Sequence, residues 1–140
     1  MPPLAALLGS ADVTLRDGTL RLPDGFAAAF VGGLVVTSWL DGCLALWPRA
    51  EWEAFAARLV RLPVADAGAR WFARLLFASA VEIGIVPDDI SLPEPQRRSA
   101  GLEGDVVLVG AGDHAELWSR GRWDEQSSRS LNELSAALAG

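Results

Sequence analysis

A pattern of Leu-Pro and Leu-Trp pairs occurs twice along the 140-residue chain and constrains the fold more than any other feature. The Leu-Pro pair recurs after 70 positions, whereas the Leu-Trp pair and a second tryptophan five residues beyond it recur after 71 positions. The anchors are Leu22-Pro23, Leu46-Trp47 and Trp52 in the first copy and Leu92-Pro93, Leu117-Trp118 and Trp123 in the second. Solenoid repeats have periods of roughly 20–50 residues, so a longer unit predicts two related half-domains.

Each copy has the alternation and punctuation of short β-strands joined by tight turns. Asp17-Gly18 is a hairpin turn signal because such a turn needs positive φ. The strands that we expect are 13–16, 19–22, 34–38, 43–47, 81–86, 90–92, 105–109 and 115–118. The helices that we expect cover 24–30, a segment starting at Pro48, and 66–79, 94–100 and 122–138. In the 66–79 helix, Phe72, Leu75 and Leu76 are expected to form the apolar stripe.

The organisation that follows is an α+β fold, mainly β with helices. Two tandem β-units form one pseudo-twofold domain, because no low-complexity linker separates the copies. We expect a first unit over 9–62, a linking helix over 63–80, a second unit over 81–125 and a C-terminal helical tail over 126–140.

Composition narrows the class of protein. The single cysteine, Cys43, excludes an internal disulfide and is consistent with a reducing compartment. No run reaches the roughly 18 apolar residues of a membrane helix, and residues 1–9 lack the basic segment of a signal peptide, so we expect a cytoplasmic protein without membrane contact. The net charge is −6, although nucleic-acid binders usually carry a basic footprint, so DNA binding would need a local cationic patch.

The one histidine, His114, follows Asp113, a pair that invites a catalytic interpretation. No serine or cysteine nucleophile motif accompanies it, so we interpret it as a strand-edge residue after a glycine-rich turn. One histidine and one cysteine supply too few ligands for a metal site. We therefore expect no catalytic residue, no metal and no cofactor, and hence no enzyme.

Three other features have plain structural interpretations. The glycine-rich stretch 110–113 lacks the Gly-Lys-Ser/Thr continuation of a phosphate loop and is typical of a β-turn. Asp88-Asp89 is typical of a solvated turn. The six tryptophans have apolar neighbours, so packing in cores and interfaces explains them better than stacking on bases.

Two arginines beside the Asp17-Gly18 turn remain as candidates for function. Alternation places Leu20 on one face of the strand and Arg21 on the other, and Arg16 precedes the turn. An outward arginine on a hairpin can contact a phosphate or a guanine edge, and it can equally be a plain surface charge. The residues themselves leave both interpretations open.

Three stretches of the chain resemble the MraZ family of bacterial transcriptional regulators. They are LDGCLALWPRAEW at 40–52, LFASAVE at 76–82 and AGLEGDVVLVGAGDHAELWSRGRW at 100–123. The resemblance covers roughly residues 9 to 125. It implies the AbrB-like swapped-hairpin fold, ring-like homo-oligomers, and a nucleoid-associated protein that binds double-stranded promoter DNA upstream of the division and cell-wall gene cluster.

The chain departs from this family at the hairpins. The family carries Asp-x-x-Gly-Arg or Asp-x-Lys-Gly-Arg with the arginine four residues before a proline, whereas Thr19 and Asp89 stand at that position here, in loops one residue short. Gly18 matches the family glycine, and Arg16 and Arg21 substitute by proximity. We therefore expect Arg16, Gly18 and Arg21 to form the DNA contact and the second hairpin to make none. The alternative is an oligomeric interaction protein that has kept the fold and no longer binds DNA.

Overall fold

The two halves of the chain contain the same series of four strands in the computed structural model, which describes residues 7–139. Those of the first half are β1 (Ser10–Leu15), β2 (Thr19–Arg21), β3 (Leu34–Ser38) and β4 (Leu44–Pro48). Those of the second half are β5 (Val81–Ile83), β6 (Asp89–Ser91), β7 (Gly104–Gly110) and β8 (Ala115–Ser119). The strand order expected from the repeat is therefore confirmed.

Helices occupy matching places between and after these strands. Pro23 and Pro93 serve as N-caps of two short helices, because the proline ring fixes φ near the helical value and offers no N–H to leave unpaired. The helical segments are α1 (Asp24–Ala27), the 3₁₀ turns η2 (Ala28–Phe30) and η3 (Leu40–Gly42), α2 (Arg49–Leu59), α3 (Ala67–Ser79), α4 (Glu94–Ser99) and α5 (Arg120–Ala139). None of them is long and apolar enough to cross a membrane within residues 7–139.

Each half keeps one hairpin, β3–β4 or β7–β8, and every other strand pairing joins the two halves. The main sheet has the order β1-β7-β8-β4-β3-β5, and β2 pairs with β6 in a separate two-stranded sheet. Exchanging the halves turns each order into itself, which is the signature of a pseudo-twofold axis. The axis passes between Leu20 and Ile90 in the small sheet, and between Ala45 and Glu116 in the large one, since each pair lies directly opposite.

The tryptophan anchors confirm this equivalence. Trp47 lies opposite Val35 on β3, and Trp118 lies opposite Val107 on β7. Each of the two tryptophans packs on the one five residues later, with ring centroids 6.0 Å apart at Trp52 and 5.6 Å apart at Trp123. The fold is thus α+β, with two tandem β-units joined in one pseudo-twofold body.

One apolar core lies between the large sheet and the β2–β6 pair. It takes residues from both halves, so neither half can bury its apolar face without the other. Its most buried side chains include Leu20, Leu22, Phe30, Leu34, Leu44, Leu46, Ile90, Val106, Leu108 and Leu117.

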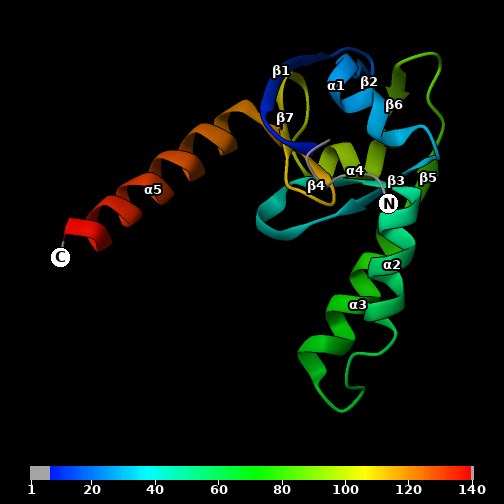
Figure 1. Cartoon of the computed structure of the whole chain (residues 1–140), viewed down its shortest axis with the longest axis vertical. Helices are drawn as coiled ribbons and strands as arrows, with labels where there is room; N and C mark the ends of the chain where they lie inside the picture. Colours follow the sequence, from blue (N-terminus) through cyan, green and yellow to red (C-terminus); the bar gives the residue numbers. More distant parts are fainter. Residues whose placement is uncertain (1–6, 140) are drawn as a thin grey trace.

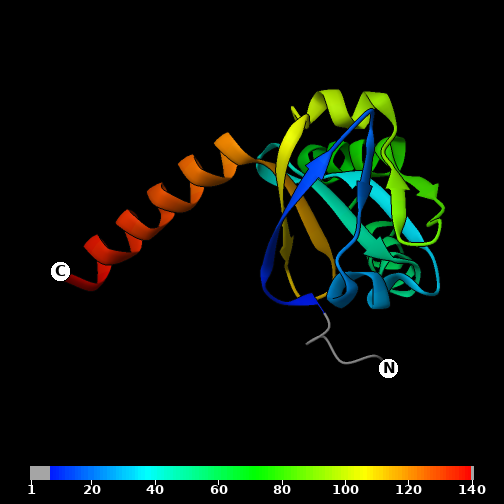
Figure 2. The same ribbon diagram turned by 90° about the horizontal axis from the view of Figure 1, so that it is seen from above.

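Two helical features extend from this body (Figure 1). Helices α2 and α3 form a protruding hairpin, and α5 points away from the strands in both views (Figures 1 and 2). Asp66 starts α3 by accepting hydrogen bonds from the N–H groups of Gly68 and Ala69. No residue of α5 is buried.

Some expected details are wrong. The strand predicted over 81–86 ends at Ile83, because Ile83 pairs with Leu34 at the start of β3 and the strand beyond has no partner. Leu75 does not belong to the buried stripe of α3: its exposed fraction is 61%, whereas that of Leu76 is 3%. Pro48 ends β4 and caps α2 instead of lying inside it.

Candidate nucleic-acid interface

The first turn (Arg16–Thr19) is a tight two-residue turn held by backbone hydrogen bonds. The N–H of Arg16 donates to the carbonyl of Thr19, and the N–H of Thr19 donates to the carbonyl of Arg16, both at 2.9 Å. Asp17 and Gly18 between them have φ of 52° and 79°. Positive φ at both central residues is the geometry of a type I′ turn, which the Asp-Gly pair predicted. A rigid turn of this kind can hold Arg16 at a defined place on the surface.

The second turn (Val86–Asp89) repeats the hydrogen-bond pattern with different residues. Val86 donates to Asp89 at 2.9 Å, and Asp89 donates back to Val86 at 3.4 Å. Pro87 and Asp88 occupy the central positions, and neither has positive φ. Counting from the Leu-Pro anchors, Asp88 takes the place of Gly18 and Val86 the place of Arg16. The two turns therefore share their closing hydrogen bonds and differ in backbone conformation and in charge.

The two turns lie at opposite ends of the β2–β6 pair, because the strands that follow them run antiparallel to each other. The N–H of Leu92 donates to the carbonyl of Gly18, and the N–H of Leu22 donates to the carbonyl of Asp88, both at 2.8 Å. The hairpin expected between 13–16 and 19–22 is thus limited to the turn, since β1 continues along β7 and β2 along β6. Each turn belongs to the surface of both units.

Pairing of β2 with β6 also brings opposite charges together. Arg21 lies directly across from Asp89, and its Nε donates to the Asp89 carboxylate at 3.0 Å. This hydrogen bond and the carboxylate charges of Asp89 and Asp88 raise the pKa of Arg21. Strand pairing thus places a cation, Arg21, beside the Asp88-Asp89 pair of the second turn. Arg21 remains 76% exposed at its side chain, so its outer guanidinium face is still accessible.

Sequence reasoning missed Arg97 as a neighbour of the first turn. Its guanidinium carbon lies only 2.9 Å from where a Cβ on Gly18 would stand. Its Nε donates to the carbonyl of Leu92 at 3.0 Å. The repeat could have revealed this contact. The family resemblance implies that strands are swapped between the two units, and this swap brings the helix after Pro93 to the first turn.

Equivalent corners of the molecule therefore have different chemistry. The first corner, formed by the first turn and α4, holds a pocket of about 360 Å³ lined by Leu15, Asp17, Gly18, Glu94, Arg97, Arg98, Leu102 and Glu103. The second corner, formed by the second turn and α1, holds a larger pocket of about 600 Å³. Its charged lining residues are Asp24, Glu82 and Asp88, all acidic. Phosphate repulsion would oppose DNA at the second corner.

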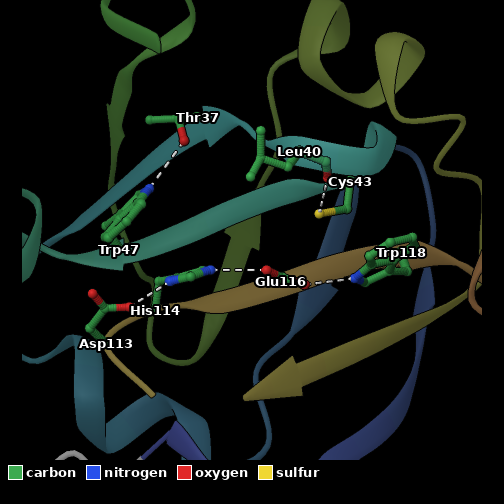
Figure 3. A network of polar contacts seen from close by, with 8 residues as sticks. All are labelled: Thr37, Leu40, Cys43, Trp47, Asp113, His114, Glu116 and Trp118. Atoms are coloured by element: carbon green, nitrogen blue, oxygen red, sulfur yellow. Dashed lines mark hydrogen bonds and ion pairs between the residues drawn. The ribbon is translucent and has the colours of Figure 1, made fainter. Parts of the chain in front are cut away.

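His114 directly precedes β8 and follows the glycine-rich turn, and its ring is buried (Figure 3). Only 7% of it is exposed. Its Nδ1 lies 2.7 Å from Asp113 and its Nε2 lies 3.0 Å from Glu116, whose other oxygen accepts from Trp118 Nε1. The ring stacks on Trp47 at 4.6 Å and meets the edge of Trp39 at 5.1 Å. These contacts make His114 a structural link between β8 and β4.

The charges in this cluster stabilise one another. Burial lowers the pKa of His114, but hydrogen bonds and charges from Glu116 and Asp113 more than offset it, so the net shift is upward. Burial raises the pKa of Glu116, but hydrogen bonds from His114 and Trp118 more than offset that effect, so the net shift is downward. Burial, together with the nearby Glu116 charge, raises the pKa of the Cys43 thiol. The cluster thus favours a charged imidazole between two carboxylates.

Residues 7–139 contain no group of three or more His, Cys, Asp or Glu side chains placed to hold a metal ion. Cys43 is a buried free thiol whose Sγ lies 3.4 Å from the Leu40 carbonyl, which accepts from it. A thiol with a raised pKa is a poor nucleophile at neutral pH. The chemistry that this surface offers is therefore charge recognition at the first corner.

Known proteins match this chain along most of its length. The family model described as "MraZ protein, putative antitoxin-like" matches residues 11–75 and 89–139. A protein named Transcriptional regulator MraZ from Heliobacterium modesticaldum is 37% identical over 125 residues, which are 86% of this chain and 87% of that protein. Proteins of the same name are 40% identical over 134 residues in Mycobacterium ulcerans (93% and 92% of the two chains) and 33% identical over 129 residues in an Acidovorax species (88% and 89%).

Proposed function

This chain belongs to the MraZ family, and from that premise we propose that it is a transcriptional regulator that binds double-stranded DNA through its first corner. The relatives named Transcriptional regulator MraZ support the regulatory role. The finer part of the proposal is that the target lies upstream of the division and cell-wall gene cluster, in the cytoplasm at the nucleoid. We further propose 9–62 and 81–125 as the limits of the two β-units.

The observation that carries the DNA proposal is the difference in charge between two turns that share a hydrogen-bond pattern. Arg16 begins the first turn, Arg21 lies two residues beyond it and across from Asp89, and both arginines are exposed. Val86 and Ser91 take their places at the second turn, which carries Asp88 and Asp89. Phosphate contacts come mainly from arginine and lysine side chains and from backbone N–H groups, so the first turn suits DNA and the second does not.

Self-association belongs to the same proposal. Leu131, Leu134 and Leu138 repeat along one face of the protruding helix α5 and are 64%, 56% and 79% exposed. Trp71 and Leu75 on α3 are 57% and 61% exposed. Exposed apolar stripes of this kind mark interaction surfaces. A ring-like homo-oligomer would repeat the first corner, so a modest contact per copy would add up to useful affinity.

A second candidate function is an oligomeric interaction protein that no longer binds DNA. Two observations favour it: the net charge is −6, and the Arg21 guanidinium already has Asp89 as a partner. Under this alternative the exposed apolar stripes are the functional surface and the first corner is a remnant.

A direct titration separates the two functions. Fluorescence anisotropy would be measured with the full chain, a labelled duplex from its own upstream promoter, and a duplex of scrambled sequence, at several salt concentrations. The proposed regulator binds the promoter more tightly, and its affinity falls as salt rises because bound arginines release counterions. Absence of binding to either duplex at low salt would reject the DNA proposal and favour the interaction protein.

A further inference from the structure

The side chain of Arg97 connects the second β-unit to the turn of the first. Arg97 lies on α4, and its guanidinium covers the α-carbon of Gly18, where a Cβ would come within 2.9–3.1 Å of three of its atoms. A Cβ at position 18 would displace this guanidinium from its place against the turn. Arg97 is half-buried there, and no carboxylate of residues 7–139 forms an ion pair with it.

Gly18, Leu92 and Arg97 contact one another around the first turn. The Gly18 carbonyl accepts from the N–H of Leu92 at 2.8 Å, and the Leu92 carbonyl accepts from Arg97 Nε at 3.0 Å. The Arg97 guanidinium then returns to Gly18. The backbone of the turn is therefore held on one side by β6 and on the other by an arginine from α4.

The second turn has the equivalent backbone hydrogen bond but lacks the arginine contact. The Asp88 carbonyl accepts from the N–H of Leu22, which reproduces the backbone half of the arrangement. Ala27 stands four residues after Pro23, as Arg97 stands four residues after Pro93, and its methyl group is too short to complete the other half. The contact of Arg97 with Gly18 is thus a feature of the first corner and not a consequence of the fold.

We propose that Arg97 is a positioning residue for DNA binding: it braces Gly18 and thereby holds Arg16 and the turn amides where they meet the phosphate backbone. The inference rests on the proposed function. It adds that the contact surface of the first unit is set from the second unit, so the two units bind DNA as one body. Arginine is suited to this role because a planar guanidinium packs flat on a backbone while its Nε donates.

The test compares three variants of the full chain. Arg97→Gln removes the guanidinium, and Arg97→Lys keeps the charge without the planar group. Arg129→Gln is the matched control, since Arg129 lies on α5, outside the first corner, and pairs with Glu125. We expect Arg97→Gln and Arg97→Lys to weaken promoter binding about tenfold, the effect of removing one hydrogen bond of a charged group. Arg129→Gln should bind like the unmodified chain.

The salt dependence separates positioning from direct binding of phosphate. Removing an arginine that neutralises one phosphate lowers the slope of log affinity against log salt by about one unit. Removing a positioning residue lowers affinity and leaves this slope unchanged. A reduced slope in Arg97→Gln, full rescue by Arg97→Lys, or an equally weakened Arg129→Gln would overturn the inference.

A measurement without DNA keeps the inference separate from the proposed function. In an amide ¹H–¹⁵N spectrum of the free protein, Arg97→Gln and Arg97→Lys should shift the Gly18 resonance and speed its hydrogen exchange, whereas the Asp88 amide stays unchanged. An unmoved Gly18 resonance would reject the brace even if DNA binding were present. Movement at Gly18 with no DNA binding by the unmodified chain would reject the proposed function and with it the role of the brace in binding.

Discussion

The turns of the first and second corners share a hydrogen-bond pattern and differ in backbone conformation and in their side chains. Both turns are closed by the same pair of backbone hydrogen bonds. In each turn one carbonyl, that of Gly18 or Asp88, also accepts a hydrogen bond from the leucine N–H of the opposite Leu-Pro anchor. The first turn carries Asp17 and Gly18 in positive φ, with Arg97 covering the glycine. The second carries Pro87 and Asp88 without positive φ, and Ala27 leaves its pocket open.

This difference separates what the fold needs from what the surface does. The pseudo-twofold requires buried apolar residues at equivalent places, and both halves supply them. It places no demand on the charges outside, so the two corners are free to diverge. A position with similar residues in both copies is therefore a candidate for a packing role. A position where the copies differ in charge is a candidate for a functional role that one copy has and the other has lost.

The largest effect is expected on the axis, where the two copies agree. Leu20 and Ile90 lie opposite each other and are 2% and 0% exposed. Leu20→Ala and Ile90→Ala should each lower the free energy of unfolding by about 3 kcal/mol, the usual cost of such a cavity. Urea denaturation of both variants measures this. A large decrease for one and almost none for the other would contradict the equivalence of the two halves.

A smaller effect is expected at the centre of each turn. Gly18→Ala places a Cβ at φ 79° and against Arg97, so it should cost about 2 kcal/mol in the free energy of unfolding. The equivalent Asp88→Ala meets neither obstacle and should change it by no more than about 0.5 kcal/mol. Thermal and urea melts of the two variants compare them directly. Equal costs would show that the turns are held alike.

The copies also differ behind the sheet, where His114 takes the place of Cys43. The raised pKa of His114 gives stability that is complete below its ordinary value of 6.5 and is lost as pH rises through the higher folded value. The lowered pKa of Glu116 gives stability that is complete above 4.5 and is lost as pH falls through the lower folded value. Between pH 4.5 and 6.5 both contributions are present.

We therefore expect the free energy of unfolding to fall as pH rises above 6.5 in the unmodified chain, and to fall less in His114→Gln. Cys43→Ala is the matched control: because burial raises the pKa of that thiol, its removal should leave the pH profile between 5 and about 8 unchanged in shape. Urea melts at several pH values measure these profiles. Parallel profiles for the unmodified chain and His114→Gln would exclude a charged imidazole.

The smallest effect on stability is expected from the ion pair between Arg21 on β2 and Asp89 on β6. Arg21 and Asp89 are both solvent-accessible, and exposed pairs contribute little because water screens them. Asp89→Ala should leave the melting temperature unchanged within error while it frees Arg21 for phosphate. A marked drop in stability would mean that this pair is structural, and it would weaken the claim that the corners differ only outside the core.

The repeat predicted the strand order, the shared core and the Asp17-Gly18 turn, because buried apolar residues and positive-φ turns leave local signals. Strand pairing between the halves is a long-range property, so the contact of Arg21 with Asp89 left no local trace. The position of Arg97 against Gly18 was hidden for the same reason. Leu75 was misplaced because α3 alternates apolar residues on two faces, and only the packing of the hairpin decides which face is buried.

DNA binding is proposed to belong to the first corner and to be opposed at the second, and one pair of double variants tests this most directly. Arg16→Ala with Arg21→Ala and, as the matched pair, Asp88→Ala with Asp89→Ala would be titrated with promoter duplex at several salt concentrations. The arginine variant should bind more weakly, with a salt slope lower by about one unit for each phosphate that it no longer neutralises. The aspartate variant should bind as well as the unmodified chain or better, most clearly at low salt. Unchanged affinity and slope in the arginine variant would contradict the role of the first corner.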